Sequence, residues 1–147
     1  MKKIILITIL ACTTLITRAE ELKWHTDAKK ALELAKAEKK LVMLDFTGSD
    51  WCGWCIKLHN EVFSKTEFAE YAKKNLVLVE VDFPRRKKLS EEQQKANFAL
   101  QEKYKIEGYP TLIVLDGEGK KVGELGYVTG GPKAFIAEFE KKTKRAG

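Results

Sequence analysis

Cysteine, proline and methionine are scarce in this chain, with three, three and two residues among 147. So few prolines, together with a hydrophobic fraction of 44%, argue against a disordered or low-complexity protein. The length suffices for one domain that buries its own core without disulfide staples. Neither an internal repeat nor a linker divides the sequence, so we expect a single domain.

The chain also lacks a hydrophobic run suited to spanning a membrane. The apolar stretch over residues 4–16 is short and is interrupted by three threonines. Two lysines precede it, and small residues at Thr17 and Ala19 follow, which is the pattern of a secretory signal peptide. We therefore expect a signal peptide over residues 1–19, one mature domain over residues 20–147, and a periplasmic or secreted protein.

Two alternatives apply to the same N-terminal segment. The sequence Ile-Leu-Ala-Cys over residues 9–12 is compatible with a lipobox, in which Cys12 is acylated and the protein tethered. Leu10 is bulky for its position and the apolar segment continues past Cys12, so the cleaved signal peptide is favoured. An uncleaved membrane anchor is the remaining alternative.

A strong charge of one sign is absent as well. The whole chain has 27 basic and 21 acidic residues and a formal net charge of +6. Cleavage after Ala19 removes three basic residues and no acidic one, which leaves 24 against 21 and a net charge of +3. A charge this small on an exported protein is a weak reason to expect a nucleic-acid partner, and we expect none.

Cleavage would leave two cysteines, Cys52 and Cys55. A pair three residues apart closes almost no loop and contributes little as a staple, so in an oxidising compartment it fits a reactive role better. A zinc site needs four ligands; His25 and His59 are the histidines that could complete one, but His25 precedes the first helix. Covalent haem is excluded because Ile56, rather than histidine, follows Cys55. We expect no metal site.

Hydrophobic periodicity predicts alternating helices and strands. The expected helices cover residues 26–40, 51–74 with an interruption at Ser64, 90–103, and 132 onward. The expected strands cover residues 41–46, 76–83, 111–115 and 121–125. The expected caps are Thr26, Ser64 and a capping box of Ser90 with Gln93. The first two strands should be parallel and the last two antiparallel, which predicts an α/β sandwich around a mixed sheet.

Cys52 stands where a strand ends and a helix begins. Unpaired N–H groups and the positive end of the helix dipole favour a thiolate there, and such positions bring a thiol pKa from ~8.5 to roughly 3.5–7.5. Cys55 lies one turn further in, so we expect it to be more buried and less acidic. Cys52 is then the expected nucleophile that attacks a partner disulfide, and Cys55 the thiol that resolves the mixed disulfide.

Several motifs together resemble the thioredoxin superfamily over roughly residues 41–141. They are Trp51 and Gly53 around the first cysteine, the apolar strand before them, and Ile106-Glu107-Gly108-Tyr109-Pro110-Thr111 downstream. The resemblance is greatest to exported single-domain thioredoxin-like proteins of bacteria. It implies a thioredoxin-like three-layer α/β/α sandwich with a central mixed β-sheet. It also implies a cis Tyr109–Pro110 bond that lies against the dithiol and presents backbone to an extended substrate segment.

The resemblance further implies a thiol–disulfide oxidoreductase that reduces or isomerises disulfides in exported proteins, with no cofactor beyond the Cys52–Cys55 pair. The expected partners are those proteins and an upstream membrane or periplasmic electron donor, and we expect a monomer. Substrate contacts are expected at Trp51, Gly53, Trp54, Tyr109 and Pro110. A dithiol oxidase and a non-enzymatic module that binds a soft metal such as Cu(I) remain as alternatives, although no third cysteine supports the latter.

Two features depart from the family pattern. Gly53-Trp54 separates the cysteines, in place of the Gly-Pro of reducing thioredoxins or the Gly-His of isomerases. Without a histidine one stabiliser of the thiolate is missing, which argues against a strong oxidant. Asp45 lies seven residues before Cys52, one more than the buried acid of the family. We still expect Asp45 to accept the proton of Cys55 during resolution.

A basic loop over residues 85–88 follows the second strand. Parallel strands that end at Phe46 and Phe83 finish at the same edge of the sheet. The loop should therefore lie near the active-site face, and we expect it to favour acidic partners.

Overall fold

The computed structural model describes residues 22–143, so the expected signal peptide over residues 1–19 and Cys12 lie outside the described residues. The strands are β1 (Trp24–His25), β2 (Leu41–Thr47), β3 (Leu76–Asp82), β4 (Thr111–Leu115) and β5 (Lys121–Leu125). The helices are α1 (Ala28–Glu38), α2 (Gly53–Leu58), the π-helical turn η1 (His59–Phe63), α3 (Thr66–Asn75), α4 (Glu91–Tyr104) and α5 (Gly131–Thr143). No helix within residues 22–143 has both the length and the apolar composition that crossing a bilayer requires.

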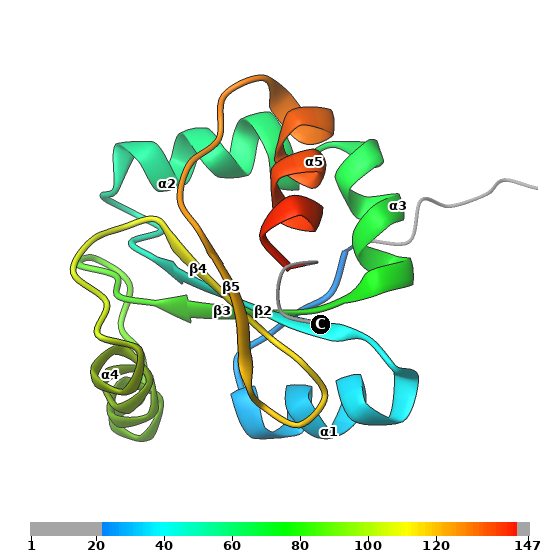
Figure 1. Cartoon of the computed structure of the whole chain (residues 1–147). Helices are drawn as coiled ribbons and strands as arrows, with labels where there is room; N and C mark the ends of the chain where they lie inside the picture. Colours follow the sequence, from blue (N-terminus) through cyan, green and yellow to red (C-terminus); the bar gives the residue numbers. More distant parts are fainter. Residues whose placement is uncertain (1–21, 144–147) are drawn as a thin grey trace, which may run out of the picture.

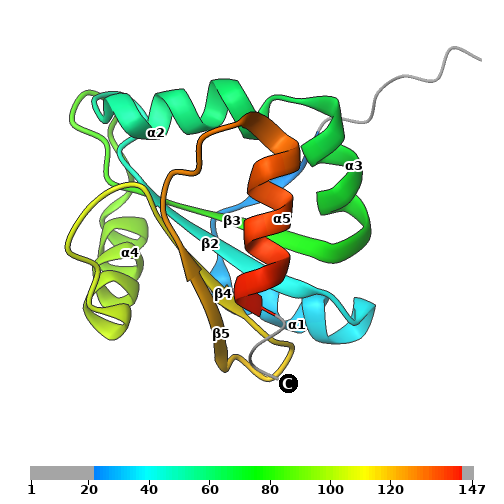
Figure 2. The ribbon, with the colours of Figure 1, turned by 45° about the horizontal axis from the view of Figure 1, so that its top comes forward.

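The five strands form one sheet in the order β1-β3-β2-β4-β5, and the sheet lies between two layers of helices. Figure 1 shows α1 and α4 on one side of the sheet and α2, α3 and α5 on the other. The turned view in Figure 2 shows the same separation, with α4 standing at the side of the molecule. The predicted three-layer α/β/α sandwich with a mixed sheet is confirmed.

Strand pairing brings three loops to one edge of the sheet. β2 is parallel to β3, and β4 forms an antiparallel hairpin with β5, as the sequence predicts. β2 also pairs with β4 in the antiparallel direction. At one end of β2, Thr47 pairs with Asp82 and Phe46 pairs with Thr111. The loops that follow β2 and β3 therefore meet the loop that precedes β4.

Side-chain alternation along β2 divides the core into two clusters. Met43 packs with Leu58 and the aromatic residues of α3 and α5 on one face. Leu44 packs with Ala31 of α1 on the other face. Asp45, two residues beyond Met43, therefore lies on the face that α2 covers.

Two predicted helix starts differ from the structure. Asp27, rather than Thr26, caps α1, because its carboxylate accepts hydrogen bonds from two backbone N–H groups in the first turn. Ser90 caps α4 by accepting from the Gln93 N–H at 3.1 Å, but the Gln93 side chain does not complete a capping box. Its amide donates to Asn97, one turn further along α4, and to the Thr26 carbonyl before α1. The second of these contacts depends on the tertiary structure.

The predicted break near Ser64 is confirmed, but Ser64 does not start the next helix. It ends η1, and its hydroxyl donates back to the Asn60 carbonyl at 3.0 Å. Lys65 precedes α3 and makes no side-chain cap bond. The strand β1 was not predicted, since two residues carry no period and only their parallel pairing with β3 makes them a strand. The other predicted elements differ from the structure only at their ends.

Polar side chains hold α4 in place. Asn97 is the one residue of α4 that is fully buried. Its Nδ2 donates to the Asp82 carbonyl at 2.8 Å. Gln101 Nε2 donates to the Tyr109 hydroxyl at 2.8 Å. The helix is thus tied to the end of β3 and to the loop before β4, both at the edge where the three loops meet.

We expect Asn97→Ala to lower the free energy of unfolding by about 1–2 kcal/mol, because it leaves the buried Asp82 carbonyl without its donor. Urea unfolding followed by circular dichroism measures the change. Lys95→Ala, at an exposed position of the same helix, is the matched control. Equal stabilities of the two variants would show that the amide does not anchor α4.

Candidate active site

Cys52 and Cys55 form a disulfide at the start of α2, with their Cα atoms 5.2 Å apart. Cys52 is the N-cap residue of α2, and its Sγ accepts a hydrogen bond from the Cys55 N–H at 3.2 Å. Its own N–H donates to the Gly48 carbonyl at 2.8 Å, which closes the turn after β2. The sequence predicted this strand–turn–helix setting for the dithiol correctly.

The expected difference in burial between the two cysteines is not found. Cys52 is 7% exposed and Cys55 is 6% exposed. In the disulfide state both residues are buried to nearly the same extent. Hydrogen bonding distinguishes them instead, because the sulfur of Cys52 accepts an N–H from the first turn of the helix.

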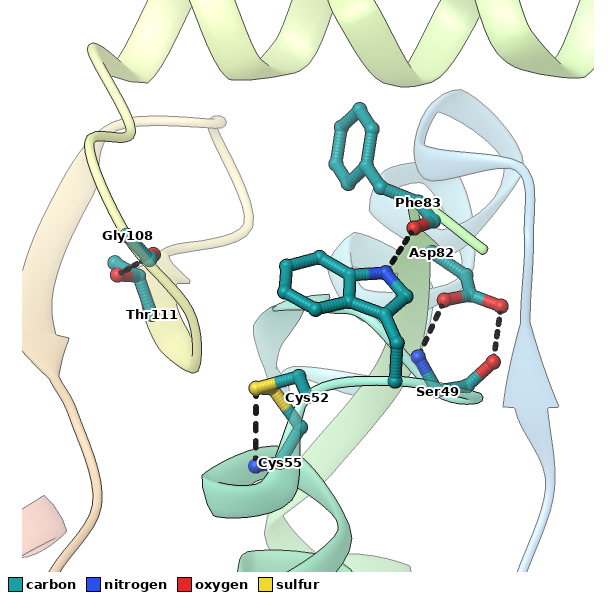
Figure 3. Close-up of a disulfide and its surroundings, with 8 residues drawn as sticks. Ser49, Cys52, Cys55, Asp82, Phe83, Gly108 and Thr111 are labelled. Atoms are coloured by element: carbon teal, nitrogen blue, oxygen red, sulfur yellow. Dashed lines mark hydrogen bonds between the residues drawn. A yellow bond between two sulfur atoms is a disulfide. The ribbon is translucent and has the colours of Figure 1, made fainter. Parts of the chain in front are cut away.

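The Trp51 indole joins the turn after β2 to its neighbours. Its Nε1 donates to the Phe83 carbonyl at 2.8 Å, and its ring meets the Tyr109 ring edge-on at a centroid distance of 5.9 Å. The guanidinium carbon of Arg85 lies 3.9 Å from the centre of the indole. A Cβ at Gly48 would approach the indole to 2.4 Å, so position 48 accommodates no side chain while Trp51 keeps this place. The hydrogen bond to the Phe83 carbonyl is one of the dashed lines in Figure 3.

The Tyr109–Pro110 peptide bond is cis, and it directly precedes β4 at the edge where β2 ends. In Figure 3 the loop with Gly108 and Thr111 lies across from the disulfide. The Thr111 hydroxyl donates to the Gly108 carbonyl at 2.7 Å and closes this loop. Tyr109 thereby lies against Trp51, the residue that precedes the first cysteine.

Asp82, the last residue of β3, fixes the other side of the turn. It is 3% exposed, and its two oxygens accept from the Ser49 N–H at 2.9 Å and the Ser49 hydroxyl at 2.6 Å (Figure 3). Neither residue was predicted from the sequence as part of the site. The sequence did contain a signal for this pair. Ser49 follows the end of β2 by two residues, and Asp82 ends the parallel strand β3.

Asp45 is a buried acid beneath α2. It lies within β2, two residues before the strand ends, and pairs with Glu80 of β3. Its Oδ1 has no hydrogen-bond partner within residues 22–143. Burial, together with the negative charges of Glu80 and Asp82, raises the pKa of Asp45 to about 8. The pKa of Glu80 is raised as well, first by burial and then by Asp82. Asp45 is therefore largely protonated at neutral pH in the disulfide state.

The basic loop over residues 85–88 lies beside the active-site turn, as predicted. The Asp50 carboxylate accepts from the backbone N–H groups of Arg85, Arg86 and Lys87 at 2.8 to 3.0 Å. These hydrogen bonds lower the pKa of Asp50 to about 2. Asp50 was not predicted as a functional residue, and its role is to hold the loop against the turn that carries the dithiol.

Trp54, between the cysteines, is 57% exposed. Its ring contacts the Tyr127 ring at 5.2 Å, and Lys57 Nζ lies 5.1 Å from the centre of the indole. The Tyr127 hydroxyl donates to Glu61, which raises the pKa of Tyr127. Gly53 faces open space among the described residues. Tyr127 was not predicted from the sequence as a residue of the site.

The structure does not bring the two histidines to the cysteines as a metal-binding set. Within residues 22–143, no three His, Cys, Asp or Glu side chains are grouped so that they could hold a metal ion. His25 belongs to β1, and His59 is an exposed residue at the start of η1.

We expect Asp50→Ala to release the basic loop, so that amide hydrogen exchange of residues 85–87 accelerates at least about tenfold at pH 7. Glu92→Ala, on the exposed surface of α4, is the control and should leave these amides protected. A carboxylate with a lowered pKa stabilises the fold above its unfolded pKa of 3.8, and this stabilisation is lost as the pH falls toward about 2. Protection of these amides in the unsubstituted protein should thus persist at pH 4, and its loss there would contradict the assignment.

Comparison with known proteins agrees with this geometry. A family model described as a thioredoxin-like domain matches residues 28–143. The chain is 40% identical over 126 residues to the disulfide bond reductase DsbH of Chlamydia pneumoniae, covering 86% of this chain and 75% of that protein. It is 32% identical over 108 residues to the thioredoxin-related protein DsbJ of the same organism, covering 74% of this chain but only 31% of DsbJ.

Solved structures show the same likeness. A structure described as DsbH oxidoreductase superposes with a TM-score of 0.81 at 38% identity, covering 89% of this chain and 90% of that chain. A thioredoxin from Thermus thermophilus gives a TM-score of 0.63 at 22% identity over 87% and 92% of the two chains, which bears on the fold alone. The chain belongs to the thioredoxin-like family and is a thiol–disulfide oxidoreductase of the thioredoxin superfamily.

Proposed function

We propose that the protein reduces disulfide bonds in exported proteins, with Cys52 as the nucleophile and Cys55 as the resolving thiol. The observation that carries the proposal is the Cys52–Cys55 disulfide at the start of α2, where Cys52 Sγ accepts the Cys55 N–H. The same hydrogen bond and the helix N-terminus would stabilise a Cys52 thiolate once the disulfide is reduced.

The reaction is a two-electron thiol–disulfide exchange. The Cys52 thiolate attacks one sulfur of the substrate disulfide, which forms a mixed disulfide and releases the other substrate sulfur as a thiolate. Cys55 then loses its proton and attacks the Cys52 sulfur. This step forms the Cys52–Cys55 disulfide and releases the second substrate thiolate. A donor dithiol must return two electrons and two protons before the next cycle.

Asp45 is the group that we propose to accept the proton of Cys55. It lies on the face of the sheet that α2 covers, and its Oδ1 has no competing hydrogen-bond partner among the described residues. Its pKa of about 8 lies close to the ordinary thiol pKa of ~8.5, so proton transfer between the two groups would be nearly balanced.

The substrate contacts proposed for this site lie around the disulfide. Trp51 and Tyr109 form its packed side, and Trp54 is the exposed aromatic between the cysteines. Pro110 directly precedes β4, and its backbone is the group that we propose to contact an extended substrate segment. A Cβ at Gly53 would meet no atom of the described residues, which supports an open approach to the disulfide.

The direction of electron flow is proposed from two observations. The 40% identical relative is described as a disulfide bond reductase. The residues between the cysteines, Gly53 and Trp54, include no histidine that would stabilise the thiolate further. We therefore propose a reductase in preference to an isomerase or an oxidase.

The N-terminal pattern over residues 1–19 supports export to the periplasm or beyond. A third relative, the thiol:disulfide interchange protein DsbD of Pseudoalteromonas atlantica, is 30% identical over 105 residues, which is only 16% of that protein. We propose that electrons reach Cys52 and Cys55 from a membrane or periplasmic dithiol protein.

Insulin reduction with dithiothreitol as the donor tests the function. We expect Cys52→Ser to abolish the catalysed rate, and Cys55→Ser to accumulate a mixed disulfide that non-reducing electrophoresis detects. The reduction potential of the pair should lie near the about −270 mV of a reducing thioredoxin rather than the about −120 mV of a strong oxidant. A potential close to the second value would make the protein an oxidase.

Asp45→Asn tests the proton acceptor. Because the pKa of Asp45 is raised, its protonated carboxyl contributes stability that is fully present below the unfolded pKa of 3.8. This contribution is lost as the pH rises through about 8. We expect the oxidised variant to match the unsubstituted protein at pH 4 and to exceed its stability by on the order of 1–3 kcal/mol at pH 9.

In the same variant the mixed disulfide should resolve more slowly, since Asn cannot accept a proton. Rapid quenching of single turnovers measures this step, and the exposed Glu33→Gln is the control. An unchanged rate of resolution would show that Asp45 affects stability but does not accept the proton of Cys55.

A further inference from the structure

A pocket of about 430 Å³ opens between the loop after β3 and α4, next to the active-site turn. Phe83, Leu89 and Phe98 supply its apolar side. Phe98 is 58% exposed, which is unusual for so large an apolar side chain. We call this pocket the Phe98 pocket.

The walls of the Phe98 pocket are held by contacts that do not depend on a ligand. The Phe83 ring packs against the Phe98 ring and the Tyr109 ring, each at a centroid distance of 5.4 Å. Asn97 ties α4 to the end of β3, and Asp50 ties the loop to the active-site turn. The pocket is therefore preformed, so a ligand would not have to order it.

Two of the lining residues adjoin the active site in the sequence. Trp51 and Tyr109 line the pocket, and each directly precedes a residue of the active site, Cys52 and Pro110. A polypeptide whose cysteine reacts with Cys52 can thus place a neighbouring side chain against the aromatic wall.

The rim of the pocket is basic. Lys87 and Lys88 line it, both are exposed, and neither forms a salt bridge within residues 22–143. By contrast, Arg85 stacks on Trp51 and Arg86 donates to the Asp50 carbonyl, so both of these cations have local partners. Lys87 acts on the carboxyl of Glu80 only through its charge, without a salt bridge. Two exposed lysines without a salt bridge in the described residues, beside an exposed aromatic side chain, complement an acidic segment that carries an apolar residue.

We propose that the Phe98 pocket is a substrate subsite for a large apolar or aromatic side chain, in an acidic stretch of the polypeptide next to the target disulfide. The proposal rests on the reductase function proposed above. It adds a class of preferred substrate, because the pocket binds the chain around the disulfide while Cys52 attacks the disulfide itself.

Two synthetic peptides test the subsite. Both contain the same intramolecular disulfide, and one has Asp, Glu and Phe flanking each cysteine while the other has Ser and Gly. We expect kcat/KM to favour the acidic Phe peptide about tenfold, mainly through KM, since an apolar side chain leaves water and acidic groups gain partners.

In the variant Phe98→Ala and in the double variant Lys87→Gln/Lys88→Gln, the ratio of the two kcat/KM values should fall toward one. Leu34→Ala on α1, another exposed apolar side chain, and Lys29→Gln/Lys74→Gln, at exposed lysines elsewhere, are the matched controls. Both controls should keep the tenfold preference.

Three outcomes would overturn the subsite. If the protein reduces insulin but has equal kcat/KM values for the two peptides, the subsite is refuted and the reductase function is not. An enzyme that reduces neither insulin nor the peptides refutes the reductase function and the subsite together. A concentration-dependent dimer in size-exclusion chromatography that Phe98→Ala abolishes would assign the pocket to a second copy of the chain.

Discussion

The parallel pairing of β2 with β3 is the constraint on which the active site depends. It makes both strands end at the same edge, with Thr47 beside Asp82, so the turn that carries Cys52 and the basic loop lie side by side. Antiparallel pairing of β2 with β4 brings the loop that contains Pro110 to the same edge. Segments far apart in the sequence thereby form one surface, and the contacts between them are polar and aromatic rather than part of the main core.

Each of these three segments is tied to the next by a specific contact. Trp51 links the turn to the Phe83 carbonyl and to the Tyr109 ring. Asp82 holds the turn from below through Ser49. These contacts fix the positions of the groups around the disulfide, which is the support that a reactive site needs from its surroundings.

Burial of acids beneath α2 has an energetic cost that the rest of the core offsets. Asp45 and Glu80 pair across β2 and β3 with raised pKa values, in positions where apolar residues would be more stable. The Asp45 carboxyl has little structural reason to be there, since its Oδ1 has no partner among the described residues. A buried carboxyl whose pKa lies near neutral pH is suited to accepting and releasing protons. The same raised pKa of Asp45 therefore affects both the stability of the fold and the proposed exchange reaction.

Local sequence determined the helices and strands, their order and the dithiol at a helix start, because hydrophobic periodicity and turn residues act over a few positions. It also placed the basic loop near Cys52, since parallel strands share a direction. Only the tertiary structure decided that Asp50 binds that loop, that Asp82 holds Ser49, that Gln93 donates to the Thr26 carbonyl, and that Trp24 and His25 pair with β3 as a strand. Those contacts join residues distant along the chain, and a hydrogen bond between such partners leaves no periodic trace in the sequence of either one.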